Sequence, residues 1–209
     1  MSRQVGLISD PHASPEPLFD ALSIFRRREI DIILCAGDIA GYGSDLERSV
    51  EALSTNDCHA VLGNHDLWWL ADEDGEGGTA TSYLRGLSAT FVTEVEGKVI
   101  SMVHGAPPDL VMDGIRLLDE DGRVIPEQRE FWSERLESLP CDVLVVGHTH
   151  QVFAERFGDL LLVNPGSTCF NHTCAILTLP ELEVEFIPLC GREPLLSWSW
   201  GMIGRRGGA

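Results

Sequence analysis

The sequence predicts an α/β fold that becomes mostly β in its second half. Short apolar runs recur along the chain and end in glycine or a polar residue, as buried strands do. The spacing from Asp10 to Asp38, and from there to Asn64, is close to the roughly 30 residues of a βαβ unit. After residue 150 the apolar runs are separated only by glycine, Asn-Pro or proline, which indicates antiparallel strands.

In the first half, three strands alternate with helices. The run 5–9 is followed by Ser14, a good N-cap, and by Pro15, which favours the first helical turn. The run 30–36 is almost wholly apolar, as a parallel strand covered on both faces is. The expected elements are strand 5–9, a helix from Ser14 to Arg28, strand 30–36, a helix capped by Ser44 and ending at Leu53, and strand 58–62.

The second half contains more strands than helices. Residues 72–82 are acidic and rich in glycine and are expected to form a loop before a short helix at 83–87. Glu96-Gly97 separates two apolar runs and indicates a hairpin, and 107–126 carries turn residues. The remaining expected elements are strands 91–95 and 98–103, a helix over 127–139, and strands 143–146, 152–157, 160–163, 174–179 and 183–187.

The composition indicates one acidic globular domain. Of the 209 residues, 44% are hydrophobic, enough for one sizeable core, so we expect a single domain over 1–209 with a flexible tail at 201–209. The formal net charge of −18 repels phosphates, so we expect no nonspecific binding to nucleic acid or to anionic membranes.

Secretion, membrane insertion and disulfide bonding are not indicated. The N-terminus leads directly into an apolar run without the pattern of a secretory signal, and no apolar run approaches the roughly 20 residues of a membrane span. None of the six cysteines belongs to a C-x-x-C pair, and we expect reduced thiols in the core. We therefore expect a cytoplasmic protein.

Polar side chains that can bind metal follow five of the apolar runs. They are Asp10 and His12, then Asp38, then Asn64, then His104, and then His148 and His150. Because the carboxyl ends of strands in an open α/β sheet share one crevice, these groups can converge there. Two carboxylates, one amide and four imidazoles exceed the needs of one tetrahedral ion and suit two divalent cations such as manganese, iron, zinc or nickel. Any one of these residues taken alone could equally be a turn or cap residue.

The order and spacing of these residues resemble the calcineurin-like metallophosphoesterase family. The motifs that carry the resemblance are Asp10-Pro11-His12, Gly37-Asp38, Gly63-Asn64-His65-Asp66, His104-Gly105 and Gly147-His148-Thr149-His150. The short length and Gly41-Tyr42-Gly43 are similar to the small bacterial and archaeal phosphodiesterase-like members. The resemblance implies a four-layer α/β/β/α sandwich, in which two mixed sheets are flanked by helices.

The resemblance also implies a role for each residue. It assigns the first ion to Asp10, His12 and His150, the second ion to Asn64, His104 and His148, and the bridging position to Asp38. His65 would face the substrate and protonate the leaving oxygen, while a water activated by the cations attacks phosphorus. Asp66 either orients His65 or caps the helix after the turn, and capping is favoured.

Some positions depart from relatives. Ser14 stands where many relatives have asparagine. The phosphoprotein phosphatase branch has basic phosphate anchors after the bridging aspartate and before the Gly-Asn-His turn, and this chain lacks both. The segment Asn164-Pro165-Gly166-Ser167 resembles a family segment near the site, but Phe170, Asn171 and His172 replace the basic residues that often follow it.

Several further residues are candidates for the rim of the crevice. The loops 72–82 and 107–126 are expected to rim the crevice, and the candidate phosphate contacts are Arg85, Arg116 and Arg123. Trp68-Trp69 can stack a nucleobase or pack in the core, and the core is favoured. We expect structural roles for His59 and His172, and the alternative for His172 is contact with the substrate. Trp198 and Trp200 are expected to pack the C-terminal segment against the domain.

We therefore expect a hydrolase of small phosphomonoesters or phosphodiesters that depends on two divalent metal ions, with nucleotides among the candidate substrates. One alternative is a diadenosine-polyphosphate or phosphoprotein hydrolase. The other is a noncatalytic scaffold similar to the retromer subunit of related fold, which lacks the histidine that this chain has at position 65.

Overall fold

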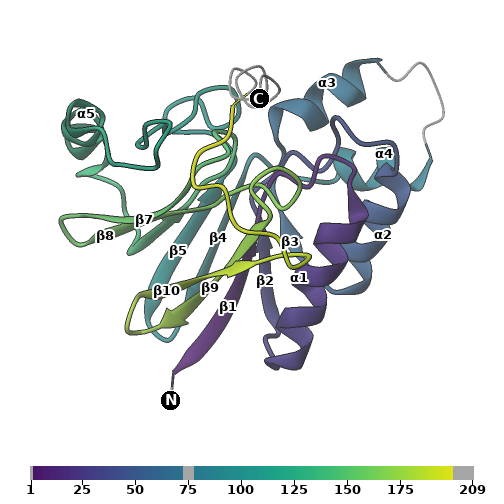
Figure 1. The fold of residues 1–209 in the computed structure, drawn as a ribbon, viewed down its shortest axis with the longest axis horizontal. Helices are drawn as coiled ribbons and strands as arrows, with labels where there is room; N and C mark the ends of the chain where they lie inside the picture. The colour runs from purple at the N-terminus through teal and green to yellow at the C-terminus, as the bar shows by residue number, and fades with distance from the viewer. Residues whose placement is uncertain (1, 73–77, 200–209) are drawn as a thin grey trace.

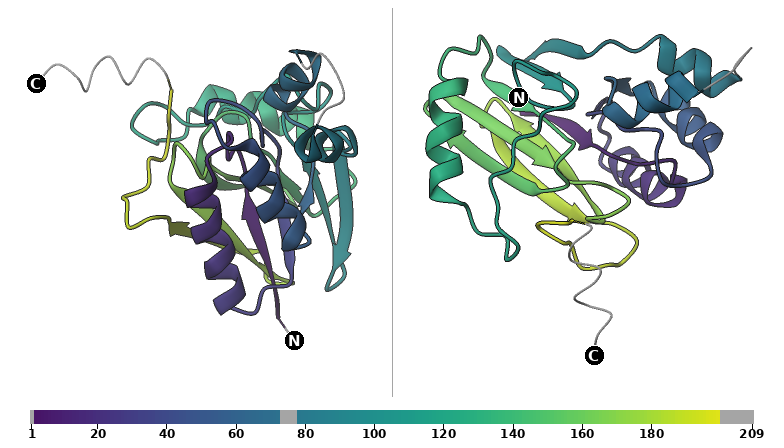
Figure 2. Two further views of the ribbon diagram at one scale, coloured as in Figure 1. Left: turned by 90° about the vertical axis from the view of Figure 1, so that its right-hand side faces the viewer. Right: turned by 90° about the horizontal axis from the view of Figure 1, so that it is seen from above.

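Two five-stranded sheets pack face to face between two layers of helices (Figure 1). The computed structural model describes residues 2–72 and 78–199, so the expected tail at 201–209 and Trp200 lie outside the described residues. Seen from above, α5 lies on one side of the paired sheets and α1 and α2 lie on the other (Figure 2). The predicted four-layer α/β/β/α architecture is confirmed.

The first sheet has the order β10-β9-β1-β2-β3. Its strands are β1 (Arg3–Ile8), β2 (Ile32–Cys35), β3 (His59–Ala60), β9 (Thr173–Leu179) and β10 (Glu183–Pro188). The first three strands are parallel to one another, and β9 runs antiparallel to β1. The helices of this half are α1 (Pro15–Arg27), α2 (Leu46–Thr55), α3 (Asn64–Asp72) and α4 (Thr79–Arg85).

The second sheet has the order β4-β5-β6-β8-β7. Its strands are β4 (Thr90–Val95), β5 (Lys98–Val103), β6 (Val143–Val145), β7 (Val152–Phe157) and β8 (Leu160–Pro165). The expected hairpins form, but β8 also pairs in parallel with β6, so the late strands are not all antiparallel. Helix α5 (Pro126–Leu136) buries Trp132 and Leu136 against this sheet.

Alternation along β1 shows how the layers are held together. Val5 and Leu7 belong to the apolar cluster between the two sheets, while Ile8 belongs to the cluster under the helices. Gly6 faces the helices with Ile8, and a Cβ added there would lie 2.8 Å from the Phe25 ring of α1. The absent side chain lets the helix approach the strand closely.

Helix ends are the main difference from the sequence-based expectation. Helix α4 begins at Thr79, inside the stretch expected to be a loop, because Ala80, Thr81 and Leu84 are buried together. Asp45 rather than Ser44 occupies the N-cap of α2. Residues 73–77 of the expected loop lie outside the described residues.

Cysteine burial is less uniform than expected. All six cysteines are free, but only Cys35 and Cys174 are buried, and Cys190 is exposed. Within residues 2–72 and 78–199, no helix is both long enough and apolar enough to cross a membrane.

The contact between Gly6 and Phe25 predicts a size conflict. Gly6→Ala is expected to lower the free energy of unfolding by about 1–3 kcal/mol, because the added methyl group meets a ring that is fully buried. Adding Phe25→Leu to this variant should cost less than Phe25→Leu costs alone, because the smaller side chain makes room. Urea denaturation of the two single variants and the double variant measures this coupling, and strictly additive losses would contradict it.

Candidate metal centre

The residues predicted to bind metal come together at the edge of the sandwich where parallel strands of both sheets end. This edge is uppermost in Figure 1, opposite the N-terminus. The first sheet delivers Asp10 and His12 after β1, Asp38 after β2 and Asn64 after β3. The second sheet delivers His104 after β5, and His148 and His150 after β6.

The first set of side chains consists of Asp10, His12 and His150. One ligand atom from each lies within 4.8 Å of the others. The Nε2 atoms of the two histidines are 3.0 Å apart, and Asp10 Oδ1 lies 3.2 Å from His150 Nε2. All three residues are buried.

The second set consists of Asp38, His104 and His148, whose ligand atoms also lie within 4.8 Å of one another. Asn64 completes this set. Its Oδ1 lies 3.0 Å from His104 Nε2 and 2.8 Å from His148 Nδ1. The amide oxygen therefore points into the space that the two imidazoles share.

Asp38 lies between the two sets. Its Oδ2 is 3.9 Å from His12 Nε2, and its Oδ1 is 3.3 Å from His104 Nε2. One carboxylate thus presents one oxygen to each set, which is the arrangement a bridging ligand needs. Each set combines side chains from both sheets.

The donor chemistry fits divalent cations. Asp10 and Asp38 are buried, and within the described residues neither forms an ion pair with lysine or arginine. Burial of two carboxylates close together is unfavourable unless positive charge compensates them. Carboxylate, amide and imidazole donors in two adjacent groups match the ligand preferences of borderline divalent metals.

The electrostatics of the cluster reflect these contacts. Burial raises the pKa of Asp10, but the imidazoles of His150, His104 and His12 outweigh it, so the pKa falls well below its usual value. Burial lowers the pKa of His104, but the Asp38 carboxylate outweighs this effect and raises the pKa to about 9. The carboxylates and the imidazoles of the cluster thus interact favourably with one another.

The carboxylates also fix the backbone of the loops. Both oxygens of Asp10 accept the His148 backbone N–H at 3.2 Å, and Asp38 Oδ1 accepts the His65 N–H at 2.8 Å. Asp66 accepts the N–H of Gly63 at 2.8 Å, as a residue that caps α3 does, and also the N–H of Ala40 at 2.7 Å. Within the described residues, Asp66 forms no hydrogen bond or ion pair with the His65 side chain; it joins the loops that carry Asp38 and Asn64.

The ligand-bearing turns use unusual backbone conformations. The residues with positive φ include Asp10, His12, Asp38, His148 and His150. Gly147 itself does not have a positive φ, whereas His148 and His150 after it do. Space explains this glycine, since a Cβ there would lie 2.2 Å from Ser9 Oγ and 2.7 Å from Asp10 Oδ2.

Three supporting residues were not predicted individually. Ser9 donates its hydroxyl to Asp10 Oδ2, and Ser167 donates its hydroxyl to the Asp10 carbonyl at 2.6 Å. Asn164 donates to the Gly147 carbonyl at 2.9 Å. The segment 164–167, expected near the site from the resemblance, therefore supports the turns that carry Asp10 and His148. No spacing rule in the sequence could identify these hydroxyl contacts.

His65 lies at the mouth of a cavity of about 260 Å³ next to the cluster. Its ring centroid is 4.6 Å from that of Tyr42 and 4.8 Å from that of Trp68, and the His65 side chain is half-buried. Burial lowers the pKa of His65, although the Asp38 and Asp10 carboxylates oppose this effect. His65 also lies within ligand distance of His12 and Asp38, so geometry alone permits it to bind a cation.

The two adjacent tryptophans have different environments. Trp69 packs against the core, as favoured from the sequence, whereas Trp68 is exposed and lines the cavity. Helical geometry explains the difference, because neighbouring residues of α3 point in directions about 100° apart.

Of the arginines proposed as phosphate contacts, Arg116 lines the cavity. Arg85 and Arg123 are not among its lining residues, and Arg123 pairs with Asp121 at 2.7 Å. His172 contacts Arg192, and His59 stacks on Phe91, in agreement with structural roles. Trp198 lines the cavity and stacks on Phe170, whose ring contacts His12 and His150.

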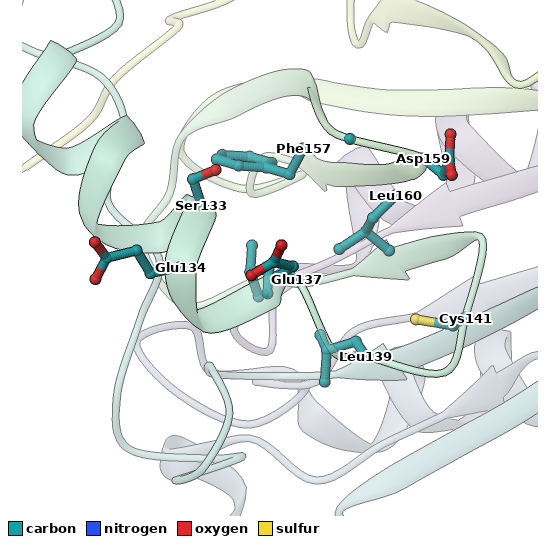
Figure 3. A pocket seen from close by; sticks show the side chains of 10 residues that line it. Ser133, Glu134, Glu137, Leu139, Cys141, Phe157, Asp159 and Leu160 are labelled. Carbon is teal, nitrogen blue, oxygen red and sulfur yellow. The ribbon is translucent and has the colours of Figure 1, made fainter.

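A larger cavity of about 570 Å³ lies elsewhere, between α5 and the turn joining β7 to β8 (Figure 3). Its side chains include Glu134, Glu137 and Asp159 around Phe157 and Leu160. No imidazole lines it, and none of the clustered ligands does, so it is separate from the candidate metal centre.

Comparison with known proteins agrees with this geometry. Residues 4–181 match the calcineurin-like phosphoesterase superfamily domain. An uncharacterized protein of Methanocaldococcus jannaschii is 39% identical over 191 residues, which cover 84% of this chain and 74% of that protein. A probable metallophosphoesterase of Methanothermobacter thermautotrophicus is 30% identical over 188 residues, which cover 86% of this chain and 83% of that protein.

Solved structures share the fold. A hypothetical protein of Pyrococcus horikoshii superposes with a TM-score of 0.70 at 18% identity, covering 97% of this chain and 91% of that one. At this identity the likeness concerns the arrangement of the sheets and helices.

The two hydrogen bonds that Asp66 accepts from backbone N–H groups predict that its replacement destabilises the fold. Asp66→Ala is expected to lower the free energy of unfolding by about 2–4 kcal/mol, because two buried donors lose their acceptor. Asp66→Asn should lose less, since its carbonyl oxygen still accepts one of the two bonds. Chemical denaturation compares the variants, and equal stability of Asp66→Ala and the unaltered protein would contradict the supporting role.

Proposed function

The chain belongs to the calcineurin-like phosphoesterase superfamily and is a metallophosphoesterase, and from this premise we propose that it hydrolyses phosphomonoesters or phosphodiesters with two divalent cations. The observation that carries the proposal is the position of Asp38, which presents one oxygen to each of two ligand sets. The six free cysteines support the expected cytoplasmic setting.

In this proposal, the first cation is held by Asp10, His12 and His150. The second is held by Asn64, His104 and His148, and Asp38 is shared. When bound, such cations supply charge that stabilises phosphoryl oxygens and lowers the pKa of water. The chain's own contribution is to fix the donors, which the hydrogen bonds from His148 and His65 to the two carboxylates achieve.

We assign the general acid to His65. It is the least buried of the imidazoles at the centre, it lines the cavity, and its ring lies among aromatic side chains rather than deep between the carboxylates. A histidine at this place can give a proton to the leaving oxygen. The backbone N–H of His65, held by Asp38, keeps the side chain at a fixed position relative to the cluster.

The phosphoprotein alternative gains no support from the site. Tyr42 and Leu62 stand near the two ligand-bearing turns at the positions where that branch has its basic anchors. The cavity beside His65 is small, about 260 Å³, which favours a small phosphorylated molecule.

Metal titration tests the two-cation site. Metal-free protein is expected to bind two equivalents of Mn²⁺ per chain in calorimetry, with a rise in the thermal midpoint. Asp38→Asn should weaken both equivalents, because both sets lose a carboxylate oxygen. His59→Ala is the matched control, since that histidine stacks on Phe91 away from the ligand sets. A stoichiometry of one in the unaltered protein would exclude the paired site.

Leaving-group dependence tests the role of His65. With Mn²⁺-loaded protein, His65→Ala is expected to slow hydrolysis of an alkyl phosphate such as glycerol phosphate by roughly 10²–10⁴-fold, because alkoxide leaves poorly without a proton. Hydrolysis of p-nitrophenyl phosphate should fall much less, because p-nitrophenolate leaves without protonation. Equal losses on the two substrates would contradict general acid catalysis, and unchanged rates in both His65→Ala and Asp38→Asn would overturn the proposed activity.

A further inference from the structure

Trp68 is a large apolar side chain that the fold leaves outside the core. It is 50% exposed, although its neighbour Trp69 packs against the apolar cluster under the helices. It lines the cavity beside the candidate metal centre, one helical turn after His65. An exposed aromatic ring at the wall of a ligand cavity is a stacking surface for a flat group.

The ring of Trp68 is close to the position of the leaving group. Its centroid lies 4.8 Å from that of His65, and the centroid of Tyr42 lies 4.6 Å from that of His65. Tyr42 is also half-exposed, at 49%. If His65 protonates the leaving oxygen, the group attached to that oxygen must lie beside these two rings. The leaving group is therefore expected to contain a flat aromatic part.

Arg116 provides a second feature of the same cavity. It is exposed, and among the described arginines only Arg116 and Arg85 make no hydrogen bond, ion pair or ring contact with another described residue. Arg116 therefore keeps its guanidinium free of any acidic partner in the described part of the structure, although the chain has a formal net charge of −18. A guanidinium presents a planar pair of donors that matches a phosphate.

The position of Arg116 follows from the packing of the loop that carries it. A Cβ added at Gly114 would lie 2.4 Å from His148 Cδ2, so this segment runs directly over a ligand histidine. Thr149 donates its hydroxyl to the Ile115 carbonyl at 2.9 Å, which fixes the residue before Arg116. The arginine is thus attached firmly beside the second ligand set.

We propose that the substrate is a nucleoside diphosphate, with its base stacked on Trp68, its terminal phosphate at the two ligand sets and its second phosphate bound by Arg116. This inference rests on the proposed function and names the substrate class of that site. A nucleoside diphosphate supplies both an aromatic base for Trp68 and a second phosphate for Arg116. A sugar phosphate lacks the aromatic ring, and an aryl monophosphate lacks the second phosphate.

The reaction balances as a hydrolysis. Water adds to the terminal phosphorus, and the bond from that phosphorus to the bridging oxygen breaks. The bridging oxygen takes the proton of His65 and leaves on the nucleotide, which is shortened by one phosphate. The water supplies the oxygen of the inorganic phosphate, and one of its protons restores His65.

The contribution of Arg116 is tested with ADP and AMP as probes, using Mn²⁺-loaded protein. Arg116→Gln is expected to raise KM for ADP roughly tenfold or more, with a much smaller change for AMP, because only ADP carries the second phosphate. Arg116→Lys should recover part of the ADP preference. Arg85→Gln is the matched control, since this arginine also lacks a partner among the described residues but does not line the cavity. Equal changes for both nucleotides in Arg116→Gln would overturn the assignment.

The contribution of Trp68 is tested by comparing AMP with ribose phosphate. Trp68→Leu is expected to lower the ratio of kcat/KM for AMP over ribose phosphate by roughly tenfold, because the stacked base is lost. Quenching of tryptophan fluorescence by ADP should also weaken in this variant, and the part that remains is expected from Trp198 in the same cavity. Leu67→Ala on the same helix is the matched control, since Leu67 is exposed but does not line the cavity. An unchanged ratio together with unchanged quenching would overturn stacking on Trp68.

The fluorescence titration separates this inference from the proposed function. If the unaltered protein hydrolyses no phosphate compound with any divalent metal, the proposed function fails. Binding of ADP that depends on Trp68 and Arg116 would then still support the ligand class. Turnover of p-nitrophenyl phosphate with no preference for ADP over AMP or ribose phosphate would leave the function standing and overturn the ligand class.

Discussion

Burial of two carboxylates is the constraint on which the site depends. Asp10 and Asp38 are withdrawn from water, and carboxylates in such surroundings need donors or positive charge around them. Imidazoles and backbone N–H groups fill that need on the protein side, and ring nitrogens of the imidazoles lie together with the carboxylate oxygens, where cations would complete the arrangement. The same two residues therefore shape the loops and define the chemistry. Replacing either aspartate would therefore disturb both the loops and the metal-binding site.

The backbone around the two carboxylates has conformations that residues other than glycine usually avoid. Asp10, His12 and Asp38 all have positive φ, which is unfavourable for residues with a Cβ. Hydrogen bonds between the loops hold these conformations, since Asp10 N–H donates to the Gly37 carbonyl and His12 N–H to the Asp38 carbonyl, each at 3.0 Å. The turns after β1 and β2 thus stabilise one another, and the sheet beneath them provides a rigid base.

The sequence predicts the ligand-bearing turns well because each one follows a buried strand, and strands that run parallel end at the same edge. It predicts less about contacts that depend on side-chain direction. The hydroxyl of Ser167 reaches the Asp10 carbonyl across 157 positions of sequence, and no periodicity reports such a contact. Trp68 and Trp69 are identical in type and adjacent, so only the orientation of α3 decides which one is buried. The early start of α4 has the same origin, because tertiary burial of Leu84 overrides the glycine-rich composition before it.

Each ligand set draws side chains from both sheets, which has a mechanical consequence. The Nε2 atoms of His12 and His150 meet although they are 138 positions apart in the chain. A cation bound by both histidines would form a reversible link between the two sheets. Separation of the two sheets would then require the metal to dissociate first. The dissociation rate of the ion would therefore limit the rate of unfolding, and with it the rate of proteolysis or denaturation.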